Sequence, residues 1–193
     1  MVQLILIRPG ATDYDQQGRI QGTLEVPLSA EGAAQVAQMV EGLRGQKIET
    51  LYTATGQPAE ETAEAITEAL DWKLKKLDRM QNLDFGLWQG LVIDDVRVKQ
   101  PKVYRQWQEM PQNVCPPEGE MLTEADERVR AAVGKLLKRH REGVIGLVVA
   151  EPLASLVRRF VTQNELGDLW KAISEHGTFE VIEVTPEALA HAT

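Results

Sequence analysis

The chain has 193 residues and a net charge of −8, with 43% hydrophobic and 26% charged residues. This length and composition are ordinary for one compact globular domain. The acidic balance argues against a nucleic-acid face or an anionic-membrane surface. The single cysteine, Cys115, excludes an internal disulfide and a cysteine-based metal site. No apolar stretch approaches the roughly 18 residues of a membrane-spanning helix, so we expect a cytoplasmic protein without membrane contact.

The first part of the chain alternates strand and helix patterns, and apolar runs indicate strands that are buried on both faces. The predicted elements are a strand over 2–8, a helix capped by Ser29 and ending near Arg44, a strand over 48–53, a helix over 59–70 and an edge strand over 72–77.

The second part begins with an irregular segment over about 79–122, which holds a Pro-rich loop. The predicted elements are a helix over about 92–109, a long helix from a Thr123 cap to Glu142, a buried strand over 144–149, a helix from Pro152 to about Gln163, and a strand over 178–184 before a polar tail. Alternating strands and helices predict one domain over 1–193, a three-layer α/β/α sandwich with a mostly parallel central sheet. Residues 79–122 are then an irregular helical insertion or lid.

Sites in such sheets lie beyond the carboxyl ends of the strands. Three strand ends supply polar or unusual residues there: Arg8-Pro9-Gly10, Thr53-Ala54-Thr55 and Glu151-Pro152. The candidate site is therefore expected where these three loops converge.

Five segments in this order resemble the histidine phosphatase superfamily, the group that includes the cofactor-dependent phosphoglycerate mutases. They are LILIRPGATDYDQQGRIQGTLEVPLSAEGAAQ, LYTATGQPAEETAEAI, NLDFGLWQG, PPEGE and GLVVAEP. The resemblance covers nearly the whole chain and implies the phosphoglycerate mutase-like fold.

The resemblance also implies where the family's catalytic groups would lie. The histidine nucleophile falls on Pro9, the second phosphate-binding arginine on Pro58, the general acid on Asn82 and the second histidine on Glu151, while the first arginine is kept as Arg8. Proline cannot attack phosphorus, and losing one member of a cooperating catalytic set removes most of its rate enhancement. The phosphohistidine reaction of the family is therefore expected to be lost.

Arg8, the one arginine that this chain shares with the family pattern, needs a partner, because burying an unpaired charge costs free energy. We expect Arg8 to be ion-paired with Glu151 across two adjacent strand ends. A residual pocket formed by Arg8, Gly10, Arg19, Gln21, Thr53 and Glu151 is the candidate site for a weak anion or a neutral polar ligand. Hydrogen bonds that only fix the loops are an equal alternative for Arg19 and Gln21.

Few other residues are candidates for a catalytic or metal-binding role. His176 is the one histidine whose loop could approach the site, and Asp84 is an ionisable neighbour of Asn82. Asp13 and Asp15 fit turn-forming or capping roles better than a metal site. We expect no metal and no cofactor.

These observations leave two kinds of function. The first is a catalytically inactive member that serves as a binding, regulatory or assembly module, with an unknown protein partner or a small anionic ligand, and that forms a homodimer. The alternative is a phosphatase or mutase-like enzyme with altered chemistry, acting on a small phosphorylated or anionic metabolite. The missing nucleophile favours the first on sequence grounds.

Overall fold

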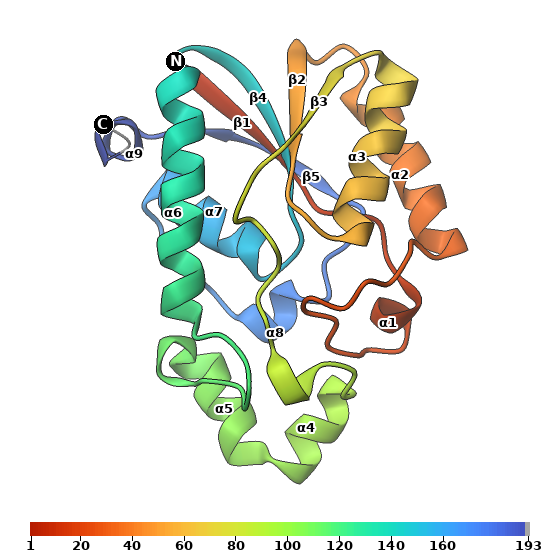
Figure 1. Ribbon diagram of the computed structural model, residues 1–193, viewed down its shortest axis with the longest axis vertical. Coiled ribbons are helices and arrows are strands. Elements are labelled where there is room, and N and C mark those ends of the chain that lie inside the picture. The colour runs from red at the N-terminus through yellow and green to blue at the C-terminus, as the bar shows by residue number, and fades with distance from the viewer. Residues whose placement is uncertain (192–193) are drawn as a thin grey trace.

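The computed structural model describes residues 1–191, and within them it forms one five-stranded sheet with the strand order β3-β2-β4-β1-β5 (Figure 1). The strands are β1 (Val2–Ile7), β2 (Ile48–Thr53), β3 (Lys73–Lys76), β4 (Gly143–Val148) and β5 (Phe179–Glu183). Neighbouring strands are parallel except β5, which is antiparallel to β1. The predicted α/β fold with a mostly parallel sheet is confirmed.

Helices cover both faces of the sheet. The helices of the described part are α1 (Asp13–Gln16), α2 (Ala30–Leu43), α3 (Gln57–Leu70), α4 (Ile93–Lys99), α5 (Pro101–Glu109), α6 (Leu122–Arg139), α7 (Leu153–Thr162), α8 (Leu169–Ala172) and α9 (Pro186–His191). Helices α2 and α3 lie on one side of the sheet and α6 and α7 on the other (Figure 1). Across residues 1–191, none of the helices has the length and apolar character needed to cross a bilayer.

The central strands end at one edge because they are parallel and in register. Ile7 of β1 and Thr53 of β2 both pair with Val148 of β4. Strands β1 and β4 are largely apolar because both of their faces are covered by helices, whereas β2 (IETLYT) mixes apolar and polar residues. The loops after Ile7, Thr53 and Val148 therefore start side by side, as the sequence predicted.

Two predicted helices differ from the structure. The helix expected over 92–109 is two helices, α4 and α5, because Pro101 lacks the N–H that would continue α4 and instead occupies the first turn of α5. The long helix is capped by Met121 rather than Thr123, and it ends at Arg139. The short helices α1, α8 and α9 were not predicted.

The segment between β3 and α6 is joined to the rest of the protein by aromatic packing. Helices α4 and α5 lie beyond the carboxyl ends of the strands (Figure 1). Trp107 of α5 is fully buried, and its ring centroid lies 5.5 Å from that of Phe85, 6.2 Å from Trp88 and 6.0 Å from Trp170. These aromatic residues pack the interior instead of forming an exposed recognition surface.

Gly32 marks a close approach between the first loop and α2. A Cβ at this position would collide with the carbonyl oxygen of Ala11, and a Cβ on Gly10 would lie 2.5 Å from the Gly32 oxygen. We expect Gly32→Ala to lower the free energy of unfolding by about 2 kcal/mol, as overpacking does. Chemical denaturation measures this, with Ala33→Ser on the exposed face of α2 as the control. Equal stability of the two variants would contradict the close approach.

Candidate functional site

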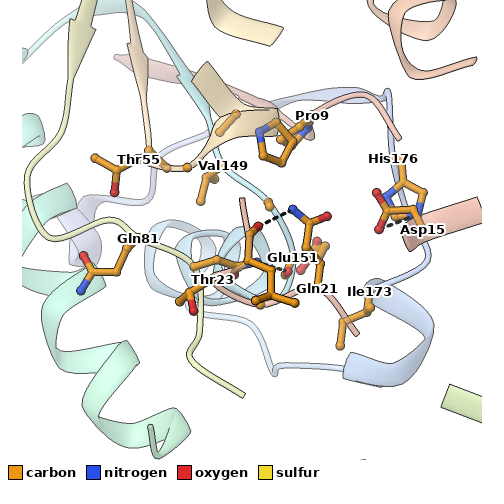
Figure 2. A pocket seen from close by; sticks show the side chains of 18 of the residues that line it. Pro9, Asp15, Gln21, Thr23, Thr55, Gln81, Val149, Glu151, Ile173 and His176 are labelled. Carbon is orange, nitrogen blue, oxygen red and sulfur yellow. Dashed lines mark hydrogen bonds and ion pairs between the residues drawn. The ribbon is translucent and has the colours of Figure 1, made fainter. Parts of the chain in front are cut away.

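A pocket lies beyond the carboxyl ends of the parallel strands, where β1, β2 and β4 continue into loops (Figure 2). Its cavity volume is about 100 Å³. The loops after these strands contribute Pro9, Thr55 and Glu151, and the segment after β3 contributes Gln81 and Asn82. This is the place where open α/β sheets bind ligands.

The four positions that the resemblance assigns to replaced catalytic residues all line this pocket, namely Pro9, Pro58, Asn82 and Glu151. Pro58 lies in the first turn of α3. The Asn82 Nδ2 donates a hydrogen bond of 3.1 Å to the backbone carbonyl of Glu151. The residues that replace the catalytic groups are thus gathered in one place, but none of them supplies the imidazole or guanidinium that a phosphohistidine mechanism uses.

Arg8 and Glu151 form the ion pair predicted from the sequence. The Arg8 Nε donates to Glu151 Oε1 at 2.8 Å, and only 8% and 2% of the two side chains are exposed. Glu151 Oε2 accepts hydrogen bonds from the N–H and the hydroxyl of Ser155, at 3.0 and 2.7 Å. Ser155 lies in the first turn of α7. An internal carboxylate therefore occupies a place between a guanidinium and a helix N-terminus that suits an anion.

Arg8 itself lies outside the pocket lining. It contacts two more carboxylates, with an Nη 3.0 Å from Glu180 and its Nε 3.4 Å from Glu175. Its side chain lines an adjoining groove of about 570 Å³. Burial by itself lowers the pKa of the guanidinium, but the charges and hydrogen bonds of Glu151 and Glu180 outweigh burial, so the pKa lies above its ordinary value. The charge of Arg8 is balanced inside the protein and is not presented to a ligand in the pocket.

Two other predicted pocket residues also lie outside the lining. The Thr53 hydroxyl is buried and donates to the Ala54 carbonyl at 2.9 Å. The Arg19 Nη1 donates to the Gly90 carbonyl at 2.7 Å. Both residues fix loops, which was the alternative weighed for Arg19, so the expected residual pocket needs correction at these positions.

Gly10 and Gln21 line the pocket as expected. The Gln21 Oε1 accepts a hydrogen bond of 3.0 Å from the Thr12 hydroxyl, so this amide is partly engaged. Two other lining residues, Thr55 and Gln81, make no side-chain hydrogen bond to any part of the chain that the structure describes. The Thr55 hydroxyl and the Gln81 amide are therefore neutral donors available to a ligand.

His176 reaches the pocket, whereas Asp84 does not. The His176 side chain is 21% exposed, and its Nε2 lies 3.8 Å from Asp15 Oδ1 (Figure 2). Asp15 has the capping role expected of it, since its Oδ2 accepts the N–H and the hydroxyl of Thr12 at 2.7 and 2.9 Å. The Asp84 carboxylate accepts the Gly86 N–H at 2.8 Å. At this distance Asp15 makes no hydrogen bond to His176, but its carboxylate lies close enough to stabilise a protonated imidazole.

A buried arginine that the sequence analysis missed fixes one wall of the pocket. Arg128 of α6 donates to both carboxylate oxygens of Glu120, at 2.7 and 2.9 Å. It also donates to three backbone carbonyls, those of Arg79, Gln81 and Asn82, at 2.9, 2.7 and 3.3 Å. Two of these residues line the pocket, so Arg128 sets the course of the backbone there. An arginine within the apolar stripe of a helix was the signal that could have revealed it.

Comparisons with known proteins agree with the fold. Residues 4–191 match the histidine phosphatase superfamily (branch 1). The chain is 28% identical over 185 residues to phosphoserine phosphatase 1 of Hydrogenobacter thermophilus, covering 95% of this chain and 87% of that protein. It is 31% identical over 138 residues to the "probable phosphoglycerate mutase GpmB" of Salmonella arizonae, covering 72% of this chain and 64% of that protein.

Solved structures show the same fold at lower identity. YhfR of Bacillus stearothermophilus has a TM-score of 0.81 at 24% identity, covering 96% of this chain and 93% of that chain. A mycobacterial glucosyl-3-phosphoglycerate phosphatase has a TM-score of 0.81 at 23% identity, covering 93% of this chain and 91% of that chain.

The expectation of a catalytically inactive module is wrong by these comparisons. The two curated relatives are named as a phosphoserine phosphatase and a probable phosphoglycerate mutase, both names of enzymes, and nothing in residues 1–191 shows inactivity. The missing nucleophile excludes the phosphohistidine route, but it does not make the protein inactive, because water can attack a phosphoryl group without a protein nucleophile. From the matched length, the order of its motifs and its fold, the chain belongs to the histidine phosphatase superfamily.

Proposed function

We propose that the chain is a phosphatase-like enzyme with altered chemistry, which hydrolyses a small phosphorylated metabolite in the strand-end pocket. The observation that carries this proposal is the His176 imidazole lining the pocket beside Asp15. The single cysteine supports a reducing compartment such as the cytoplasm.

In the proposed reaction water is the nucleophile, because Pro9 cannot be phosphorylated. His176 accepts a proton from the water as its oxygen bonds to phosphorus and the bond from phosphorus to the ester oxygen breaks. The departing oxygen, which lies on the opposite side of phosphorus, takes a proton from solvent water and leaves as an alcohol, and His176 returns its proton to solvent. Asp15 balances the transient positive charge of the imidazole.

The phosphoryl oxygens are proposed to bind the neutral donors on the other side of the pocket. In Figure 2 the Thr55 and Gln81 side chains lie opposite His176 and Asp15. A phosphoryl group between them would be held on one side and approached by water from the other. Positioning of this kind supplies much of the catalysis of phosphoryl transfer. Neutral donors stabilise the transition state less than two arginines do, so a low turnover number is expected.

O-phosphoserine is the first substrate to test, because the Hydrogenobacter relative that is named as a phosphoserine phosphatase matches 95% of this chain. 3-Phosphoglycerate and p-nitrophenyl phosphate complete the panel, each with and without Mg²⁺. The assays with Mg²⁺ test for metal dependence. Residues 1–191 contain no group of three or more His, Cys, Asp or Glu side chains that could hold a metal ion.

We expect the purified protein to release inorganic phosphate from at least one of these esters without forming a phosphoenzyme. Direct attack by water inverts the configuration at phosphorus, which a chiral oxygen-isotope phosphate ester reports, and a route through a phosphorylated side chain retains it. Absence of phosphate release from the whole panel, or retention with a labelled protein, would overturn the proposal.

A further inference from the structure

The His176 imidazole is not fixed by hydrogen bonds of its own. Within residues 1–191 its ring nitrogens make no hydrogen bond, and the contact of its Nε2 with Asp15 spans 3.8 Å. The ring nevertheless lines the pocket (Figure 2). Where the imidazole lies therefore depends on the backbone that carries it.

That backbone is anchored on both sides of His176. The Gly177 N–H donates to the Pro9 carbonyl at 2.7 Å, which ties the chain after His176 to the loop after β1. Before His176, helix α8 continues into a turn in which the Glu175 N–H donates to the Ala172 carbonyl at 2.8 Å. A displacement of α8 is therefore transmitted to His176 through this turn.

Helix α8 is docked onto α5 by Trp170. This residue is 4% exposed, and its indole N–H donates to the Tyr104 carbonyl at 2.9 Å. The Trp170 and Tyr104 rings are stacked, with an interplanar angle of 2° and centroids 5.0 Å apart. Asp168, the cap of α8, also accepts a hydrogen bond of 2.6 Å from Gln108 of α5. An indole that is stacked and hydrogen-bonded on the same residue has little freedom to move, so α5 sets the place of α8.

We propose that Trp170 is a positioning residue for His176, because by docking α8 onto α5 it holds the imidazole in the pocket beside Asp15. Its part in catalysis rests on the proposed function, whereas its part in placing the imidazole does not. Trp170 lies outside the pocket lining and acts through the backbone. A misplacement of about 1 Å can cost a reaction up to about 100-fold in rate. The neutral donors Thr55 and Gln81 come from other loops, so loss of Trp170 should lower kcat rather than raise KM.

Two-dimensional ¹H–¹³C NMR of the histidine rings measures the placement of the imidazole without requiring turnover. The chain has three histidines, and the signal that is missing from His176→Gln identifies His176. We expect Trp170→Ala to shift or broaden this signal and to leave that of His140 unchanged. Trp72→Ala is the matched control, because Trp72 also packs against the core but precedes β3, at the end of the strands away from the pocket. It should leave the His176 signal in place.

A second variant separates displacement of the imidazole from loss of a neighbouring ring. Tyr104→Leu removes the stacked partner but keeps the Trp170 indole and its carbonyl acceptor. Tyr104 is only partly buried, so this change is the milder of the two for folding. We expect a smaller change of the His176 signal than in Trp170→Ala.

Steady-state phosphate release measures the catalytic consequence. Trp170→Ala should lower kcat about tenfold and leave KM within about twofold. Trp170→Phe keeps a ring for stacking, so it should recover most of the lost kcat. A merely structural role would lower stability without separating kcat from KM.

An unchanged His176 signal in Trp170→Ala, or in Tyr104→Leu if the alanine variant does not fold, would overturn the inference. Equal changes of that signal in Trp170→Ala and Trp72→Ala would also overturn it, as would an active parent whose kcat survives Trp170→Ala within twofold. A parent that releases no phosphate, together with a displaced His176 signal in the Trp170 variant, would contradict only the proposed hydrolysis.

Discussion

His176→Gln is expected to lower kcat/KM for phosphate release by at least about 100-fold, the usual effect of removing a general base. The reason is geometric, because His176 is the one imidazole in the pocket lining and Asp15 lies 3.8 Å from its Nε2. Glutamine preserves much of the side-chain volume but cannot take a proton from water. Steady-state phosphate release with the best substrate of the panel measures the loss.

A second histidine provides the matched control. His140 is hydrogen-bonded to the Tyr52 hydroxyl at 2.8 Å and lies outside the pocket lining, so His140→Gln should leave kcat/KM within about twofold. Asp15→Asn should cause a smaller loss than His176→Gln, because Asp15 acts through the imidazole. A His176→Gln protein that stays folded and retains activity within threefold would show that another group activates the water.

Glu151→Gln is expected to lower the free energy of unfolding by about 3 kcal/mol, as breaking one side of a buried ion pair does. The change removes the charge that lies 2.8 Å from the Arg8 Nε in a contact with almost no solvent. It also weakens the carboxylate contacts to Ser155 at the start of α7. Urea denaturation followed by tryptophan fluorescence gives the difference between variant and parent.

Glu180→Gln is the matched control, because Glu180 contacts the same guanidinium at 3.0 Å but is 30% exposed. The Glu180→Gln variant should lose less than about 1 kcal/mol of its free energy of unfolding. Replacing both Arg8 and Glu151 with apolar residues should recover much of the loss from the single Glu151 variant, since neither charge is then left unpaired. Equal, small losses for Glu151→Gln and Glu180→Gln would contradict the buried pairing.

The sheet could be predicted from the sequence because its signals are local. The runs at 2–7 and 143–148 are largely apolar, the run at 48–53 is rich in β-branched and aromatic residues, and the strands begin or end within one residue of the predicted bounds. The break between α4 and α5 was also encoded, by Pro101, whose effect on the preceding residue disfavours a continuous helix. The start of α6 was misplaced because Thr123 is a good capping residue, whereas the Glu124 carboxylate accepts the Met121 N–H at 2.9 Å and the helix begins at Leu122.

The candidate site was predictable only in part. The Arg8–Glu151 pair follows from the parallel register of β1 and β4, which places their ends together. The approach of His176 could not be derived, because the irregular chain after α8 has no periodicity that fixes its path. The contacts of Arg128 join segments 46 to 49 residues apart in the sequence, and only the folded chain brings them together.

The Glu151 carboxylate has a consequence for how the protein responds to its own product. Because it is covalently part of the chain, its effective concentration between Arg8 and the start of α7 far exceeds the millimolar range that a free solute reaches. Released orthophosphate, or an oxyanion inhibitor of similar shape, cannot displace such a tethered competitor. We therefore expect released phosphate to compete with substrate only at the neutral donors Thr55 and Gln81, and not at the position that Glu151 occupies.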